Sequence, residues 1–317
     1  MYELRWNPVL KWWVMVSSER QNRPVLPEGY CPFCPGSGKV PEDYDVFSYQ
    51  NDWPIMKPNP PEVFSSSSFY KVAKSYGKCE VILYSPDHNS SLGQLPLKQI
   101  EKLVNLWTER YIELGKEKFI KYVFIFENRG EEVGVTISHP HGQIYGFPFI
   151  PKKIELELES CKEFFEKEGK CLYCKILEEE LRQKDRIVDE NESFVNFVPF
   201  FADYPYQVFI IPRNHKLSLV DFNQKEKKDL SIALKRIVQT YDKLFEKEFP
   251  YMMCFHQKPS DGKDYSYYHF HIEFYPPLRN RYTQKFNASS ETGSWTHGNP
   301  TSPEEKAREL RTIMEDL

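Results

Sequence analysis

The same order of chemical motifs occurs twice along this chain of 317 residues. Each half has a Cys-x-x-Cys pair, a strand that ends near a histidine, a long helix, another strand and a His-x-His run. The interval between the first two histidines is 51 residues in one half, from His88 to His139, and 54 in the other, from His215 to His269. Repetition of a whole element order is the signature of a duplicated unit. The sequence therefore predicts two consecutive α+β repeats.

Apolar periodicity places matching elements in both halves. Stripes at helical spacing predict helices over about 97–119 and about 224–246. Strands are expected over 80–84, 122–127, 193–198, 207–211 and 251–255. We expect the first domain to cover residues 1–160 and the second to cover residues 161–317.

Composition narrows the class of protein. With 317 residues, of which 40% are hydrophobic, the chain can bury a full core. The formal net charge of −4 gives no global sign of nucleic-acid or membrane binding. The amino terminus shows no basic segment before a long apolar run, and no apolar stretch is long enough to span a membrane. We expect a cytoplasmic protein that binds neither nucleic acid nor membrane.

Four of the seven cysteines form two Cys-x-x-Cys pairs. In a cytosolic chain such pairs are typical of metal or redox sites rather than structural disulfides. The first pair lies in a Pro/Gly loop instead of a βαβ unit, which favours zinc. With the repeated histidines, each half offers the four N and S ligands of a closed tetrahedral zinc site. The expected ligands are Cys31, Cys34, His88 and His139 in site 1, and Cys171, Cys174, His215 and His269 in site 2. Glu157 and His256 are further ligand types that could enter an alternative second site.

The run from His139 to Gln143 has the residue types of a reactive site. In an extended strand His139, His141 and Gln143 would share one face. Pro140 restricts the backbone around it, and Gly142 leaves room for a bulky group to approach. A histidine held in this way can act as a nucleophile, a metal ligand or a general base. Simple packing is the ordinary role of a lone histidine, but it does not account for the whole run.

Two arginines, Arg20 and Arg23, lie on a short polar segment. Such a pair can bind a phosphate through bidentate hydrogen bonds. The alternative is that both arginines are solvated on the surface, and the sequence does not distinguish the two. The chain has no glycine-rich loop ending in Gly-Lys-Ser/Thr, which argues against an ordinary kinase or ATPase.

Three motifs together resemble the galactose-1-phosphate uridylyltransferase family, a two-repeat branch of the histidine triad superfamily. The resemblance covers nearly the whole chain and is carried by residues 86–88 (Pro-Asp-His), 139–143 (His-Pro-His-Gly-Gln) and 271–277 (His-Ile-Glu-Phe-Tyr-Pro-Pro). It implies two tandem histidine-triad-like repeats, each an antiparallel sheet with a long helix. It also implies a homodimeric transferase of galactose metabolism, with zinc in the first metal site and zinc or iron in the second.

The resemblance also assigns roles to residues. It implies that His141 is the nucleophile and that Gln143 contacts the phosphoryl oxygens. The nucleotide-sugar contacts that it implies are Arg20, Arg23, Asn51, Asp52, Asn128, Gly134, Thr136, Lys285, Phe286 and Glu291. Two features depart from the pattern: Glu273 stands where some members have a metal-binding histidine, and residues 292–300 match poorly, which affects sugar recognition.

The implied reaction is exchange of UMP between UDP-glucose and galactose 1-phosphate by a ping-pong mechanism through a uridylyl-histidine. The attacking imidazole must be neutral, so its other nitrogen needs a hydrogen-bond acceptor, for which we expect the carbonyl of His139. Two alternatives remain at this stage. One is an adenylyltransferase or nucleoside-diphosphate-sugar phosphorylase on the same scaffold, although Gly142 matches the uridylyltransferases. The other is a non-catalytic, zinc-stabilised nucleotide-binding protein.

Overall fold

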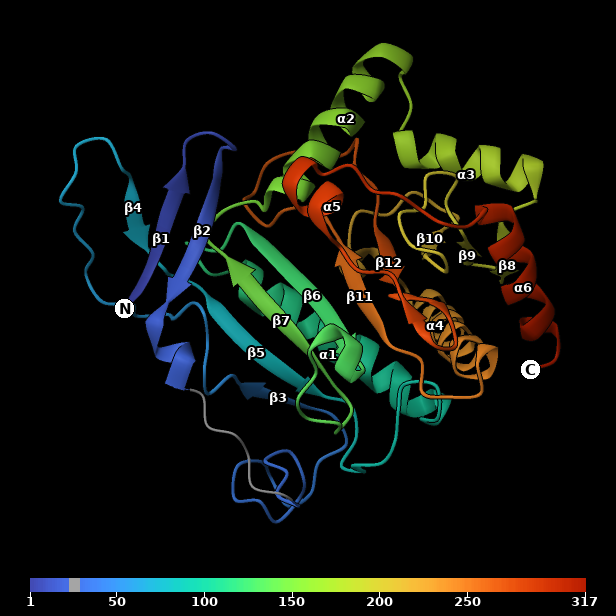
Figure 1. Ribbon diagram of the computed structural model, residues 1–317, viewed down its shortest axis with the longest axis horizontal. Coiled ribbons are helices and arrows are strands. Elements are labelled where there is room, and N and C mark those ends of the chain that lie inside the picture. The colour runs from blue at the N-terminus through green and yellow to red at the C-terminus, as the bar shows by residue number, and fades with distance from the viewer. Residues whose placement is uncertain (23–28) are drawn as a thin grey trace.

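One nine-stranded sheet runs through both halves of the chain (Figure 1). The computed structural model describes residues 1–22 and 29–317. The strands of the first half are β3 (Phe47–Gln50), β5 (Lys78–Leu83), β6 (Tyr122–Arg129) and β7 (His141–Phe147). Those of the second half are β8 (Ile187–Glu190), β9 (Phe194–Phe197), β10 (Val208–Pro212), β11 (Tyr251–His256) and β12 (His271–Tyr275).

The strand order shows the duplication directly. It runs β3-β5-β7-β6-β11-β12-β10-β9-β8, so four strands of each repeat lie in mirrored order about the centre and β8 adds a fifth strand at the edge of the second repeat. Every neighbouring pair is antiparallel, including β6 and β11, which join the two halves edge to edge. The predicted α+β fold of two antiparallel repeats is confirmed. The joining of both sheets into one is a feature that the sequence pattern did not indicate.

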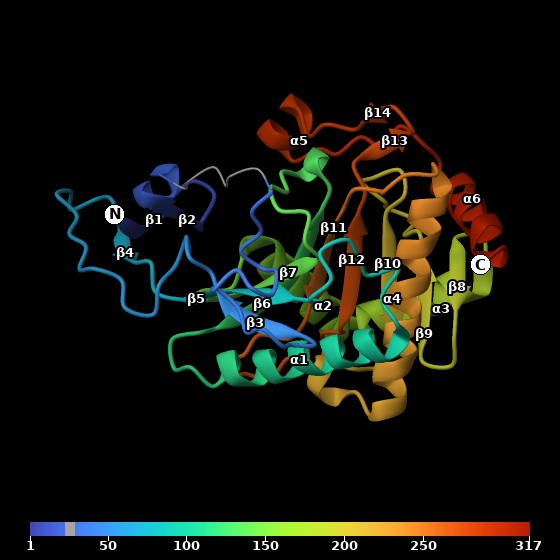
Figure 2. The same ribbon diagram turned by 90° about the horizontal axis from the view of Figure 1, so that it is seen from below.

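Two long helices cover one face of this sheet, as Figure 2 shows. They are α1 (Leu97–Gly115) and α4 (Gln224–Leu244). Their apolar stripes, including Trp107 and Tyr241, are buried in a single core that both repeats share. Each helix ends a few residues before its predicted bound. Gly115 is a poor helix former, and Glu246 has a φ of 50°, which a right-handed helix does not accept.

Two helices between the repeats were not predicted. These are α2 (Lys152–Glu168) and α3 (Leu172–Gln183). Their apolar residues Leu158 and Leu177 belong to a second core that includes Val195 and Phe209 on the opposite face of the sheet. In the first half this face is covered only in part, where Phe33 and Tyr44 form a small third core with Val81, and a cavity occupies the rest. The expected domain boundary after residue 160 falls inside α2.

The remaining elements surround the open face. A small sheet joins β1 (Tyr2–Asn7), β2 (Trp12–Ser17) and β4 (Val72–Lys74), and η1 (Ser18–Asn22) follows β2. A C-terminal arm, residues 276–300, contains β13 (Leu278–Asn280), β14 (Thr283–Gln284) and α5 (Ser289–Ser294) and lies on the side away from α1 (Figure 2). The chain ends with α6 (Pro303–Glu315). Within the described residues, no helix combines the length and apolarity needed to cross a bilayer.

Candidate active site and metal centres

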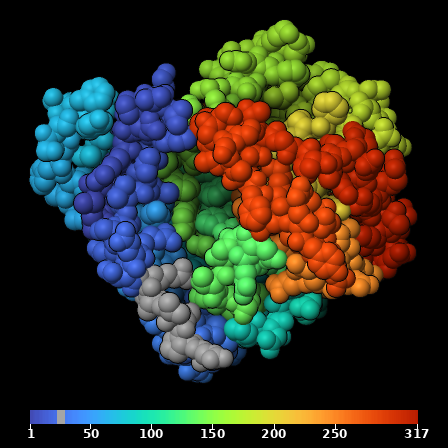
Figure 3. Space-filling view, viewed as in Figure 1, coloured from blue at the N-terminus to red at the C-terminus, as the bar shows by residue number. Residues whose placement is uncertain are grey.

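A cavity of about 730 Å³ lies on the open face of the first repeat. Strands β6 and β7 form its floor, because their side chains point alternately to the two faces of the sheet. Ile125 and Ile144 face the helical core. Asn128, His141 and Gln143 face the cavity. Figure 3 looks onto this face, which is hollowed between the N-terminal segments in blue and the C-terminal arm in orange.

Most of the substrate-contact residues suggested by the sequence meet in this one cavity. They come from η1, from the segment after β3, from β6, from the loop before β7 and from β7 itself. Those that line it are Arg20, Asn51, Asp52, Asn128, Gly134, Thr136, His141 and Gln143. Lys39 also lines the cavity, and its Nζ lies 3.4 Å from a carboxylate oxygen of Asp52. The site therefore presents both charges and several amide groups on one surface.

Aromatic side chains form a part of the lining that was not predicted. The rings that enclose the cavity belong to Tyr30, Phe33, Tyr49, Trp53, Phe126 and Tyr145. Aromatic residues flank the predicted polar residues in the sequence, as in the run Tyr49 to Trp53, and that adjacency was the available signal. Aromatic rings beside charged and amide groups let a ligand stack on one part of the site and form hydrogen bonds with another.

His141 is held in one tautomer by the backbone. Its Nδ1 lies 2.7 Å from the carbonyl oxygen of His139, as predicted. Because a carbonyl oxygen only accepts, Nδ1 must carry the proton, and the lone pair of the neutral ring is on Nε2. The ring of Phe33 packs against the imidazole, with 5.3 Å between ring centroids. The arrangement fixes the tautomer of the neutral ring and the orientation of this side chain.

Gln143 follows two residues later on the same face of β7. The hydroxyl of Tyr145 donates a hydrogen bond to its Oε1 over 3.2 Å. With Oε1 used as an acceptor by Tyr145, the amide nitrogen of Gln143 is the donor that remains for other partners. This orientation suits hydrogen bonding to a negatively charged group such as a phosphoryl oxygen.

His139 departs from the predicted shared face. The strand begins at His141, so His139 lies before it and is only 1% exposed. Pro140, which has no N–H to donate to a neighbouring strand, separates the two histidines. His139 therefore turns toward the Cys31–Cys34 loop while His141 faces the cavity.

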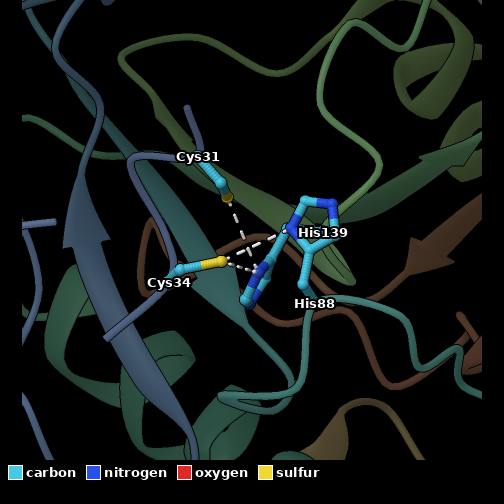
Figure 4. A group of neighbouring side chains, drawn as sticks. All are labelled: Cys31, Cys34, His88 and His139. Atoms are coloured by element: carbon cyan, nitrogen blue, oxygen red, sulfur yellow. Dashed lines mark hydrogen bonds between the residues drawn. The ribbon is translucent and has the colours of Figure 1, made fainter. Parts of the chain in front are cut away.

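The first predicted metal site is assembled (Figure 4). The Sγ of Cys34 lies 3.4 Å from Nδ1 of His88 and 3.6 Å from Nδ1 of His139, and the Sγ of Cys31 lies 3.7 Å from the same His139 atom. Zn–S bonds of about 2.3 Å and Zn–N bonds of about 2.0 Å in a tetrahedron place S and N about 3.5 Å apart. The four side chains therefore fit a zinc ion.

The surroundings of His139 suit a metal ligand. Its Nε2 donates to the carbonyl oxygen of Ser85 over 2.8 Å, which leaves Nδ1 as the nitrogen with a lone pair. Burial lowers the pKa of His139 to about 4, so the ring is neutral. The buried hydroxyl of Tyr44 lies 3.2 Å from the same Nε2 and donates to the carbonyl of Phe33, which ties the histidine to the cysteine loop.

The second predicted site repeats this geometry in the other half. The Sγ of Cys174 lies 3.5 Å from Nδ1 of His215 and 3.4 Å from Nδ1 of His269, and Cys171 Sγ lies 3.8 Å from the latter. The Nε2 of His269 is 3.2 Å from the carbonyl oxygen of Pro212. Contacts with Cys174 and the two histidines lower the pKa of Cys171, whereas the contact with Cys171 raises the pKa of Cys174, so the pair shares a proton and favours a single thiolate.

A third cluster lies beside the second site. Its members are Glu157, His256, His271 and Glu273, and their ligand atoms all lie within 4.8 Å of one another. Nδ1 of His256 is 2.9 Å from Glu157, and its Nε2 is 3.3 Å from Glu273. Glu157 and His256, suggested as alternative ligands, therefore meet two residues of the 271–277 motif. Lys153 also reaches Glu273, with Nζ 2.7 Å from a carboxylate oxygen.

The second His-x-His run lacks the access of the first. Nδ1 of His271 lies 3.0 Å from the carbonyl of His269, the counterpart of the bond made by His141. His271 is 0% exposed, and the ring of Tyr173 packs against it with 4.2 Å between centroids. The two repeats therefore share a backbone arrangement, but only the first opens onto the cavity described above.

Three of the suggested contact residues lie outside the cavity. Lys285 and Glu291 pair with each other on the C-terminal arm, with 3.3 Å between charged atoms, and the side chain of Phe286 is 69% exposed. None of the three lines the cavity. Arg23 lies outside the described residues.

Comparison with known proteins gives consistent matches along the chain. The model of the galactose-1-phosphate uridyl transferase N-terminal domain matches residues 1–151, and that of the C-terminal domain matches residues 157–287. The galactose-1-phosphate uridylyltransferase of Thermotoga maritima is 47% identical over 314 residues, which are 98% of each chain. That of Haemophilus influenzae is 32% identical over 98% of this chain and 94% of its own.

Solved structures agree with the sequence matches. A uridylyltransferase structure superposes with a TM-score of 0.92 at 34% identity, covering 99% of each chain. An ADP-glucose phosphorylase from Arabidopsis thaliana, solved with bound ADP-glucose, superposes with a TM-score of 0.77 at 25% identity, over 98% of this chain and 99% of that chain. On the near full-length identity and the two matched domains, this chain belongs to the galactose-1-phosphate uridylyltransferase family.

Proposed function

We propose that this protein exchanges UMP between UDP-glucose and galactose 1-phosphate, with His141 as the nucleophile. The observation that carries the assignment of His141 is its hydrogen bond to the carbonyl of His139, which sets the lone pair on Nε2 of a ring that lines the cavity. The near full-length similarity to galactose-1-phosphate uridylyltransferases supports the choice of substrates.

The reaction would proceed in two displacements at the same phosphorus. Nε2 of His141 attacks the α-phosphorus of UDP-glucose, a P–N bond forms, and the P–O bond to the β-phosphate breaks to release glucose 1-phosphate. A phosphate oxygen of galactose 1-phosphate then attacks the uridylyl-histidine, the P–N bond breaks, and UDP-galactose leaves. Covalent catalysis of this kind replaces one difficult step by two similar ones.

Charge on the transferred phosphoryl group would be met by residues of the cavity. The amide nitrogen of Gln143 is oriented by Tyr145, and Arg20 lines the same cavity. Hydrogen-bond donors fixed before the reaction stabilise developing charge without reorganisation. Arg23 is proposed for the same role from the sequence alone.

We assign zinc to the cluster of Cys31, Cys34, His88 and His139, whose S–N distances fit a tetrahedral ion. Bound there, zinc would supply structural rigidity to the loop and to His139. His139 would then present its carbonyl oxygen to His141 at a fixed position. The second metal site, with zinc or iron, is proposed at Cys171, Cys174, His215 and His269, with the cluster of Glu157 and His256 as the alternative.

The division of labour that we propose follows the two repeats. Residues 1–160 carry the nucleophile and the first metal site, and residues 161–317 carry the second metal site and the arm. Lys285, Phe286 and Glu291 would complete the sugar site of a second copy in a homodimer, since none of them lines the cavity of their own chain. We place the protein in the cytoplasm, where its seven free cysteines can stay reduced.

A nucleoside-diphosphate-sugar phosphorylase is the second candidate, because the plant ADP-glucose phosphorylase shares this fold. The choice can be tested by incubating the protein separately with UDP-glucose and ADP-glucose and measuring its intact mass. The proposal predicts a uridylyl adduct that galactose 1-phosphate discharges. An adenylyl adduct alone, discharged by inorganic phosphate, would favour the phosphorylase. A protein that forms neither adduct while binding UDP-glucose would be a binding protein.

A further inference from the structure

A buried tyrosine hydroxyl lies directly beneath Gly142, the residue between His141 and Gln143. A Cβ atom on residue 142 would come within 2.4 Å of the Tyr84 hydroxyl oxygen and within 3.0 Å of the Phe126 carbonyl oxygen. The first distance is far shorter than any real contact, so the Tyr84 hydroxyl fills the space that a side chain would need. Tyr84 itself is only 1% exposed and follows β5 in the core under α1.

The hydroxyl of Tyr84 is fixed from below by a buried carboxylate. Glu127, on the core side of β6, accepts a hydrogen bond from Tyr84 at Oε2 over 3.0 Å and one from Tyr251 at Oε1 over 2.9 Å. A buried carboxylate is costly unless such bonds satisfy it. Burial raises the pKa of Glu127 to about 7, which the two hydroxyls and the nearby Arg129 oppose. The bonds thus link β6, β11 and the end of β5 at one point.

The backbone of Tyr84 also contacts the segment that precedes Gly142. Its N–H donates to the carbonyl of Pro140 over 3.1 Å, and its own carbonyl accepts from Nε2 of Gln99 over 2.9 Å. Its ring packs edge-on against Trp107, with 5.7 Å between centroids. Tyr84 is therefore held on several sides and meets residues 140–142 at two places, one through its backbone and one through its hydroxyl.

We propose that Tyr84, anchored by Glu127, is a positioning residue that sets the height of the His141–Gly142 backbone above the core. The inference rests on the proposed function, because it takes His141 as the nucleophile. The imidazole of His141 is tied to the carbonyl of His139, so a shift of residues 139–142 moves the attacking nitrogen with them. A displacement of about 1 Å at a reacting group can slow a reaction by about a hundredfold.

The first test compares Tyr84→Phe with Tyr241→Phe. Both tyrosines are buried in the same core, and each substitution removes one hydrogen bond. In the wild type the hydroxyl of Tyr241 donates to the carbonyl oxygen of Tyr206. In single-turnover mixing with UDP-glucose, followed by the mass of the uridylylated protein, Y84F should react about tenfold more slowly at an unchanged half-saturating concentration. Y241F should react at the wild-type rate with a comparable loss of thermal stability. Equal rates for Y84F and wild type would overturn the inference.

The second test asks whether Tyr84→Phe suppresses the defect of Gly142→Ala. Gly142→Ala should slow uridylylation strongly, because the added Cβ meets the Tyr84 hydroxyl. In the double variant Y84F/G142A that oxygen is gone, and the next contact is 3.0 Å, so the double variant should react faster than G142A alone. A G142A defect of equal size in both backgrounds would contradict the contact. Failure of the wild-type protein to form any adduct would instead refute the proposed function.

Discussion

The imidazole of His141 donates from Nδ1 to the carbonyl oxygen of His139 over 2.7 Å, while the side chain of His139 faces the cysteines of the first metal cluster. One residue thus contributes its side chain to the cluster and its backbone to the nucleophile. The cluster and the reacting group are coupled through two bonds of the main chain, and substitutions at the two histidines should have different consequences.

His141→Gly should abolish uridylyl transfer but leave metal content and melting temperature near those of the wild type, because His141 belongs to none of the clusters of ligand residues found in 1–22 and 29–317. His139→Ala should lose the first metal and unfold at a lower temperature. Activity assays, elemental analysis and thermal unfolding of both variants check this. The assignment of separate roles fails if the two variants retain metal and stability to the same degree.

Cys31→Ser should lower the metal content by one ion per chain and reduce thermal stability, since the free energy of binding a structural metal contributes to folding. Cys79→Ser is the matched control: Cys79 is a buried cysteine that belongs to no cluster within the described residues. It should lose some stability through burial of a hydroxyl and keep every metal ion. Identical metal content in C31S and C79S would argue against the first site.

Much of this architecture was predictable because it depends on local periodicity and on a repeated motif. The stripes around Trp107 and Tyr241 predicted the two long helices, and the motif spacing predicted both clusters of two cysteines and two histidines. The pairing of β6 with β11 was not predictable, since no local pattern records which strand edges meet. Likewise α2 is rich in charged residues, and its short apolar stripe becomes meaningful only against the sheet.

In the candidate site, too, some residues were predictable from the sequence and others were not. Polar residues such as Asn128 were expected at the site from the family resemblance, but the aromatic walls arise from segments far apart in the sequence, such as Phe33 and Phe126. The placement of Lys285 away from the cavity follows from the path of the C-terminal arm, which no motif encodes. The sequence therefore could not predict which distant segments meet in space to form the site.

Glu127→Gln should change how stability depends on pH. The folded-state pKa of Glu127 is raised from 4.5 to about 7 by burial, with the charges of Arg129 and Asp242 acting in opposite directions. Between these values the native protein binds more protons than the unfolded chain, so this group makes the free energy of unfolding fall as pH rises. Across the window the fall is on the order of 3 kcal/mol, and E127Q should lack it. Urea unfolding of the wild type and of E127Q at pH 5 and pH 8 measures the free energy of unfolding of each protein. If the pKa of Glu127 were not raised, the difference in free energy between the two proteins would be the same at both pH values.

Tyr145→Phe should slow turnover through Gln143. Loss of the hydroxyl that donates to Oε1 of Gln143 lets the amide rotate, so its nitrogen is no longer held as a donor. We expect a decrease in kcat of about tenfold, smaller than the loss of a hundredfold or more typical of removing a charge-stabilising donor outright. In a Gln143→Ala background the same change should have almost no further effect. A full additional decrease there would show that Tyr145 acts independently of Gln143.

Mixing two inactive variants should restore activity if the C-terminal arm serves a second copy of the chain. Lys285 pairs with Glu291 on the arm and lies outside the cavity that contains His141. We expect His141→Gly and Lys285→Ala each to be inactive or strongly impaired as a homodimer. In a hybrid dimer, the chain with K285A keeps His141 and receives an intact arm from its H141G partner, so one of the two sites becomes complete. Denaturing and refolding the variants together should then recover up to about half of the wild-type activity per hybrid dimer, as expected for closed two-fold assemblies that share sites. If the arm served its own chain, the hybrid would contain one site without a nucleophile and one without Lys285, and mixing would recover nothing.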